Sequence, residues 1–161
     1  MMKKVLIKKL STVFIICLFS IPLFSQPPNK IRVLSYYAGR PELLDSFNIK
    51  QMTHIIFCFG RLNGNRFSIR SSRDTATIQK MVSLKDKNPE LKVLLSLGRW
   101  GGCKTCSDVF ALKQGRKEFA KSIKEFYDYF KVDGLDLDWE YPAIKGFPGH
   151  KFTPDDKKNF T

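Results

Sequence analysis

Acidic residues are scarce in this chain: its 161 residues include 15 Asp and Glu but 28 Lys and Arg, which gives a formal net charge of +13. Such a basic chain suits anionic partners, among them nucleic acid, anionic lipid and acidic wall polymers. The lysines are scattered rather than clustered, however, and residues 155–158 mix both signs. A solvated basic surface is therefore favoured, and no nucleic-acid partner is expected.

Histidine and cysteine are also few, with two histidines and four cysteines. A structural zinc site needs four ligands, usually from two close pairs. Only Cys103 and Cys106 form a close pair, and His54 and His150 have no ligand spacing. No metal or other cofactor is therefore expected. Cys103 and Cys106 are instead a candidate disulfide in an exported protein, and Cys58, which lies in an apolar run, is expected to be a buried thiol.

A long apolar run is missing too. The uncharged apolar run at residues 13–24 is shorter than the about 20 residues that a membrane-spanning helix needs. It follows a segment with four lysines and precedes the small residue Ser25. This pattern predicts a secretory signal peptide at residues 1–25, and hence a secreted protein, extracellular or periplasmic, that keeps no stable membrane insertion after cleavage. An uncleaved N-terminal anchor is the alternative.

Four short apolar runs are predicted strands, and helical patterns lie between them. The expected strands are residues 31–37, 53–59, 91–97 and 132–139, and the expected helices are residues 74–88 and 113–131. Asn63-Gly64 indicates a hairpin turn after the second strand. Asp74 is the expected cap of the first helix.

This alternation predicts an α/β fold with a parallel sheet buried under helices. A (β/α)8 TIM barrel usually needs about 250 residues. Residues 26–161 are therefore predicted to be the N-terminal half of such a barrel, about strands one to four, in a truncated sequence. A complete small doubly wound domain is the structural alternative.

The segment 132–142 has the most informative pattern, because acidic and apolar side chains alternate along it. Alternate side chains of a strand point to opposite faces. The acids that share one face are Asp136, Asp138 and Glu140, and the apolar residues on the other are Leu135, Leu137 and Trp139. Crowded and poorly solvated carboxylates repel, so at least one pKa must rise. That favours an acid catalyst, and Glu140 ends the strand, where barrel active sites lie.

Two other interpretations of this acidic row are open. A polar strand edge that faces solvent would produce the same alternation without any chemistry, although the flanking residues are strongly apolar. The Asp and Glu oxygens could also hold Mg²⁺, which prefers such ligands.

The motif Asp133-x-x-Asp136-x-Asp138-x-Glu140 resembles the signature of glycoside hydrolase family 18, the chitinase family. The similarity continues into Trp139 and Tyr141-Pro142. Residues 96–100, which read Ser-Leu-Gly-Arg-Trp, resemble the family's Ser-x-Gly-Gly-Trp motif, and Ser35-Tyr36-Tyr37 resembles the end of its first strand. The resemblance extends from about Ile31 to the end of the chain.

This resemblance implies a substrate-assisted retaining mechanism, in which the substrate's own N-acetyl oxygen is the nucleophile. It implies that Glu140 is the proton donor, that Asp138 binds the acetamido N–H and that Asp136 tunes Asp138. Tyr36 and Ser96 are implied to donate hydrogen bonds to Asp136. The implied substrate-binding positions also include Phe59, Gly98, Trp100 and Tyr141.

The substrate implied is chitin or another N-acetylglucosamine-containing oligosaccharide, cleaved at internal β-1,4 links. An endo-β-N-acetylglucosaminidase acting on N-glycans and a chitin-binding lectin on the same scaffold are the alternatives. Arg99 departs from the family pattern, which usually has a second glycine there. Because strands five to eight are absent from this sequence, the chain by itself is expected to be inactive and to aggregate.

Overall fold

The elements of the structure follow the β/α alternation expected from the sequence. The structure is a computed structural model that describes residues 31–160. The predicted signal peptide at residues 1–25 lies outside these residues. Within residues 31–160, no helix is both long enough and apolar enough to cross a membrane.

The strands in this part of the chain form one sheet. They are β1 (Leu34–Tyr37), β2 (His54–Asn63), β3 (Arg66–Ser68), β4 (Lys92–Gly98) and β5 (Gly134–Asp138). Four of them are parallel, in the order β1-β2-β4-β5, and β3 pairs antiparallel with the end of β2. The hairpin predicted from Asn63-Gly64 is confirmed, and Gly64 has the positive φ of 56° that such a turn requires.

The helices are α2 (Ser72–Ser83), α3 (Cys106–Ala111), α4 (Lys113–Phe130) and α5 (Asp156–Phe160), with 3-10 turns at Pro41–Ser46, Ile49–Gln51 and Leu84–Asp86. Two predicted helices are confirmed as α2 and α4, and α3 was not predicted. The expectation that Asp74 caps α2 is wrong. Ser71 is the cap, since its Oγ accepts from the Asp74 N–H at 3.3 Å, while the Asp74 carboxylate accepts from the Arg70 N–H at 2.8 Å.

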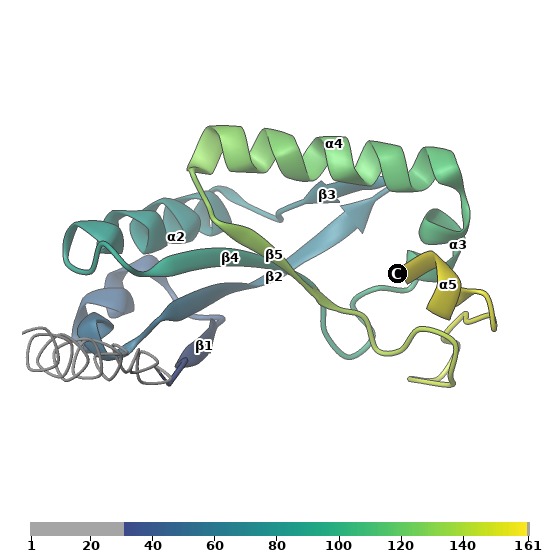
Figure 1. Cartoon of the computed structure of the whole chain (residues 1–161), viewed down its shortest axis with the longest axis horizontal. Coiled ribbons are helices and arrows are strands. Elements are labelled where there is room, and N and C mark those ends of the chain that lie inside the picture. The colour runs from purple at the N-terminus through teal and green to yellow at the C-terminus, as the bar shows by residue number, and fades with distance from the viewer. Residues whose placement is uncertain (1–30, 161) are drawn as a thin grey trace, which may run out of the picture. The chain divides into compact units, whose positions relative to one another are not determined.

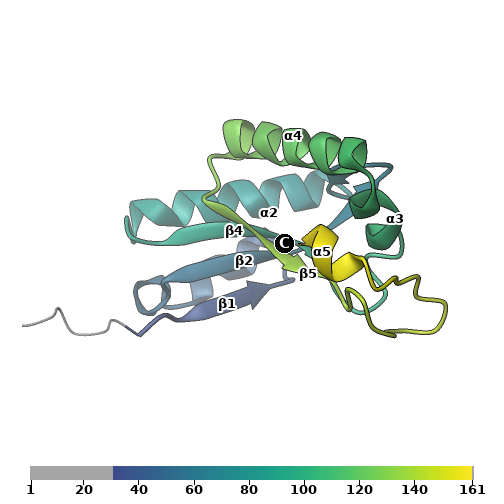
Figure 2. The same cartoon turned by 45° about the vertical axis from the view of Figure 1, so that its right-hand side comes forward.

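One face of the sheet forms the hydrophobic core beneath α2 and α4, which lie along the same side of it (Figures 1 and 2). The strand residues buried there are Ile55, Phe57, Val93, Leu95 and Leu97. From α4, Phe119, Ile123 and Phe130 are buried, as the helical spacing predicts. The hairpin joins this core as well, because the Phe67 N–H donates to Ser122 Oγ at 2.8 Å.

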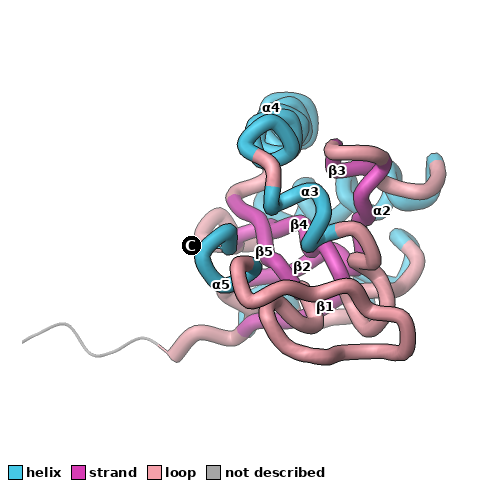
Figure 3. Tube along the Cα trace, turned by 90° about the vertical axis from the view of Figure 1, so that its right-hand side faces the viewer, coloured by secondary structure: helices cyan, strands magenta, loops and turns pink. Residues whose placement is uncertain are grey.

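The opposite face of the sheet is only partly covered by the described residues, since Ile56 and Ser96 are buried there. On β1, Leu34 and Tyr36 are 54% and 57% exposed, although β1 pairs closely with β2. Because the four main strands are parallel, their carboxyl ends lie at one edge of the sheet. Figure 3 looks onto that edge, where α3, α5 and the long connecting loops gather. Polar side chains that follow these strands are thereby brought together.

Asp156 holds the loop that follows β5 against α3. It is fully buried and its carboxylate accepts from Ser107 Oγ at 2.7 Å, the Thr153 N–H at 2.8 Å, Thr153 Oγ1 at 3.1 Å and the Ala143 N–H at 3.3 Å. Burial raises the pKa of this carboxyl group, but the hydrogen bonds lower the pKa more, so that its net shift is downward. The ionised form of Asp156 therefore stabilises the fold.

Replacement of Asp156 should show this contribution. Asp156→Ala leaves several buried donors without an acceptor, so we expect the free energy of unfolding of the full-length gene product to fall by about 3 kcal/mol. Asp156→Asn, which keeps one acceptor oxygen, should lose less. Because the folded pKa is lowered, the difference from wild type should be full above about pH 4 and shrink as the pH falls through the folded pKa. Urea unfolding at several pH values measures this, and a pH-independent difference would contradict it.

Candidate active site

The acidic row of β5 lies on the open face of the sheet, and its apolar partners lie on the core face. Leu135 and Leu137 pack against the core, and Trp139 just beyond the strand is 5% exposed. Asp136 and Asp138 alternate with them along β5 and are half-buried. The alternation predicted from the sequence is therefore confirmed as a geometric arrangement.

Asp136 is the most closely held of these acids. Its Oδ2 accepts a hydrogen bond from Ser96 Oγ at 2.7 Å and another from Tyr36 Oη at 3.1 Å. Ser96 lies directly beside Asp136 in the register of β4 and β5 and is fully buried. Partial desolvation of its hydroxyl group and the nearby Asp136 charge raise the pKa of Tyr36 to about 12, so the hydroxyl remains a donor. Asp136 thus joins β1, β4 and β5 through one oxygen.

Asp138 and Glu140 share a proton-dependent contact. Burial raises the pKa of Asp138, and the charge of Asp136 raises it further. Burial also raises the pKa of Glu140, together with the charge of Asp138 and a side-chain hydrogen bond to it. Two carboxyl groups share a hydrogen bond only when one of them is protonated. Among the described residues, Glu140 Oε2 is buried and has no hydrogen-bond partner.

Gly98 and Arg99 form a tight turn against the end of β5. A Cβ on Gly98, where φ is 132°, would lie 1.8 Å from the carbonyl oxygen of Asp138. The Arg99 N–H donates to that same oxygen at 3.1 Å. Arg99 itself has a φ of 90°, in the left-handed region that favours glycine. The turn therefore places the backbone of β4 directly against Asp138, and Arg99 adopts a conformation unfavourable for its side chain.

Aromatic side chains surround the acids. Trp100 is 57% exposed and lies edge-on to Tyr141, with 6.3 Å between ring centroids, and to Phe147, at 6.1 Å. Phe59 is half-buried beside Tyr36, with centroids 6.5 Å apart. The structure thus brings Trp100 near Tyr141 and Phe59 near Tyr36 at the carboxyl ends of the strands. Phe147 was missed from the sequence because it lies in a loop without periodicity.

Two further residues support the row of acids. Asp133 accepts from the Val93 N–H at 2.8 Å and pairs with Lys85 at 2.6 Å, which ties the start of β5 to β4.

Cys58 is buried, and burial raises the pKa of its thiol to about 12, so it stays neutral beside Asp136 and Asp138. The predicted buried thiol is confirmed, and Cys103 and Cys106, whose redox state the sequence leaves open, form a disulfide. The contribution of Cys58 to the surroundings of the acids was missed, because strand alternation alone does not reveal it.

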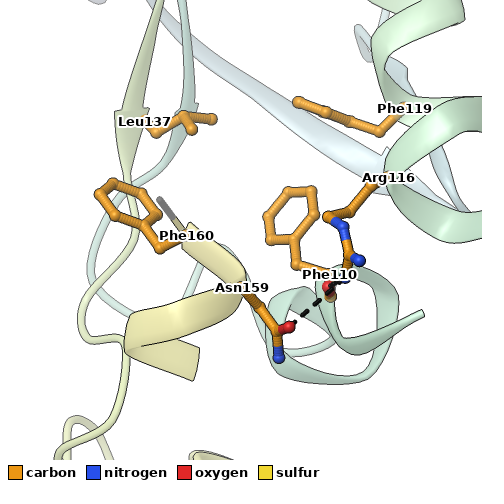
Figure 4. A pocket seen from close by; sticks show the side chains of 6 residues that line it. All are labelled: Phe110, Arg116, Phe119, Leu137, Asn159 and Phe160. Atoms are coloured by element: carbon orange, nitrogen blue, oxygen red, sulfur yellow. Dashed lines mark hydrogen bonds between the residues drawn. The ribbon is translucent and has the colours of Figure 1, made fainter. Parts of the chain in front are cut away.

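Two other kinds of site, a metal centre and an apolar pocket, were sought in residues 31–160. No group of three or more His, Cys, Asp or Glu side chains in this part of the chain is arranged to hold a metal ion. An apolar pocket of about 170 Å³ lies on the core side of the sheet, among α3, α4, α5 and β5 (Figure 4). Leu137 lines this pocket and no acidic residue does, so it is separate from the acids.

Comparisons with known proteins agree on one family. The model of glycosyl hydrolases family 18 matches residues 32–161. Chitotriosidase-1 of Mus musculus is 39% identical over 110 residues, which cover 68% of this chain and 23% of that protein. Chitinase A1 of Niallia circulans is 42% identical over 84 residues, which cover 52% of this chain and 12% of that protein. The chain thus spans less than a quarter of the length of these relatives.

A solved structure confirms the fold. The chitinase domain of the spore coat protein CotE from Clostridium difficile matches with a TM-score of 0.72 and 27% sequence identity, and the match covers 86% of this chain and 38% of that one. The predicted α/β fold, one part of a (β/α)8 barrel, is confirmed.

Substitutions in the turn after β4 should have opposite effects at neighbouring positions. Gly98→Ala places a methyl group against the Asp138 carbonyl at a positive φ, so we expect the free energy of unfolding to fall by about 3 kcal/mol. Arg99→Gly removes the unfavourable left-handed conformation and should raise it by about 1 kcal/mol. Urea unfolding of the full-length gene product measures both. Equal effects of the two changes would contradict this account of the turn.

Proposed function

Because the chain belongs to glycosyl hydrolases family 18, we propose that it carries the acid–base part of a chitinase-type active site that cleaves β-1,4 links between N-acetylglucosamine units. One observation supports this most strongly. Glu140 shares a hydrogen bond with Asp138, has a raised pKa, and has an Oε2 without a partner among the described residues. A carboxyl group with a raised pKa and an oxygen without a partner is suited to donate a proton to a substrate oxygen.

In the proposed mechanism, Glu140 protonates the glycosidic oxygen while the substrate's N-acetyl oxygen attacks the anomeric carbon. Asp138 accepts a hydrogen bond from the acetamido N–H and stabilises the positive charge that develops on the resulting ring. Asp136, held by Ser96 and Tyr36, keeps Asp138 in place and raises its pKa. Glu140, now ionised, removes a proton from the water that opens the intermediate, and the anomeric configuration is retained.

Substrate binding is assigned to the aromatic side chains at the same edge. Pyranose rings have apolar faces, which stack on exposed aromatic rings. Trp100 and Tyr141 are both exposed and lie next to each other, and Phe59 lies beside Tyr36. Gly98 keeps the backbone close to Asp138. Chitin or its oligosaccharides are favoured over N-glycans because the matched relatives carry the names chitotriosidase and chitinase.

We also propose that residues 1–25 are a signal peptide that is removed, and that residues 26–161 belong to the catalytic domain of a secreted enzyme. The disulfide between Cys103 and Cys106 supports export, because such bonds persist mainly in oxidising compartments. N-terminal sequencing of the secreted protein should find Gln26 as the first residue. A mature chain that retains Met1 would contradict the cleavage.

The variant Glu140→Gln tests the role of the acid. It keeps the size of the side chain but cannot protonate a leaving group, so we expect kcat on chitin oligomers to fall by about 10²–10⁴-fold while binding persists. Assays of the full-length gene product on chitin oligomers and on a high-mannose glycopeptide measure this and separate the two substrate classes. A wild-type protein that binds oligomers but cleaves neither substrate would indicate a lectin, and an active Glu140→Gln would exclude Glu140 as the acid.

The variant Asp138→Asn tests the coupling between the two carboxyl groups. Removal of the Asp138 charge removes a cause of the raised pKa of Glu140, so that pKa should fall. Since Glu140 must be protonated to act, the loss of kcat/KM on the alkaline side should begin at a lower pH than in wild type. The value of kcat should fall by about 100-fold because a charge that stabilises the intermediate is lost. An unchanged alkaline limb in the pH profile would contradict the coupling.

A further inference from the structure

A second cavity adjoins the acids, at the carboxyl ends of β2 and β4. Its volume is about 460 Å³, and it is lined by the end of β2, by Arg70 after β3 and by the loop after β4. This volume falls within the range of about 300–1,000 Å³ that is usual for ligand sites. Three lining residues, Phe59, Gly98 and Arg99, also belong to the surroundings of Tyr36 and Asp138. The cavity therefore shares part of its lining with the surroundings of the proposed active site.

The charged side chains of this cavity all carry the same sign. They are Arg61, Arg70, Arg99 and Lys104, and no Asp or Glu lines it. Arg70 is partly neutralised, since its Nε lies 3.5 Å from Asp74 Oδ2. Within residues 31–160, neither Arg61 nor Lys104 forms an ion pair, and both are exposed. Four cations around one hollow repel one another, and an anion placed among them would relieve that repulsion.

We propose that this basic cavity, defined by Arg61, Arg70, Arg99 and Lys104, binds an anionic substituent, a carboxylate or a sulfate, on the glycan that occupies the active site. The inference rests on the proposed function and concerns which glycans the enzyme prefers. The planar guanidinium group of arginine pairs with two oxygens of such an anion at once. Unmodified chitin carries no charge, so the cavity would select a modified N-acetylglucosamine polymer over the plain one.

The form of the cavity favours a glycan over a nucleic acid. Nucleic acids present a regular row of phosphates, and proteins bind them with an extended basic stripe or face. Here the four cations surround one hollow instead, and that hollow includes the half-buried ring of Phe59 and the backbone of Gly98 next to Asp138. The hollow therefore suits a single charged group on a glycan better than a row of phosphates.

The test compares a neutral hexamer of N-acetylglucosamine with hexamers that carry one 6-O-sulfate or one carboxylate at either end. Their Kd values are measured on full-length Glu140→Gln by titration calorimetry, at low and at high salt. We expect at least one anionic hexamer to bind about fivefold more tightly than the neutral one at low salt, and less so at high salt. The identity of that hexamer distinguishes sulfate from carboxylate.

Added to Glu140→Gln, the double change Arg61→Gln and Lys104→Gln should abolish this preference. The charge-matched control, Lys117→Gln and Lys121→Gln on α4, should retain it. With Glu140 intact, the cavity variant should cleave the neutral hexamer with an unchanged kcat/KM, which shows that the fold is preserved.

Equal affinity for neutral and anionic hexamers, or a preference that survives the cavity variant, would overturn the inference. So would a single-stranded DNA oligonucleotide that binds the cavity more tightly than either anionic hexamer. Failure of the wild-type enzyme to cleave any hexamer would instead refute the proposed function, and the affinities measured on Glu140→Gln would still decide whether the cavity binds an anion.

Discussion

The charge of Asp136 is the constraint on which the arrangement of the site depends. A half-buried carboxylate is costly unless hydrogen bonds compensate it, and here Ser96 and Tyr36 both donate to the same oxygen. These contacts join β1, β4 and β5 on the open face of the sheet. Burial raises the pKa of Asp138 and that of Glu140; the charge of Asp136 adds to the shift of Asp138, and the charge of Asp138 adds to the shift of Glu140. The carboxylate that joins the three strands thus lies on the same face as the two acids whose pKa values are raised.

The backbone around the acids is held by contacts that differ in kind from those of the core. Beneath α2 and α4, apolar side chains pack the sheet without directional contacts. At the carboxyl ends, Gly98 lies against the Asp138 carbonyl, and Asp156 binds the loop after β5 to Ser107 on α3. Hydrogen bonds have preferred distances and angles, so they fix positions more narrowly than apolar packing does. Apolar packing thus holds the sheet under α2 and α4, and hydrogen bonds fix the backbone at the carboxyl ends of the strands.

Much of this arrangement could be predicted because it depends on local periodicity. The alternation along β5, the apolar face of α4 and the hairpin at Asn63-Gly64 are all confirmed. Other features were missed for a physical reason. The short helix α3 has too few residues to display a period, Ser71 rather than Asp74 caps α2, and Phe147 meets Trp100 from a loop of irregular conformation. In each case the contact depends on the path of the backbone rather than on a repeated pattern.

By itself, the sequence determined which side chains share a face of each strand and which acids stand in one row, because the pleat of a strand has a period of two. It also determined the β/α order and the family motif. Only the tertiary structure decided that Ser96 and Tyr36 both reach Asp136, that Arg99 takes a left-handed conformation, and that cations from two separate segments of the chain line one cavity. Electrostatic and hydrogen-bonding contacts act through space, so they follow from the folded path of the chain and not from spacing along it.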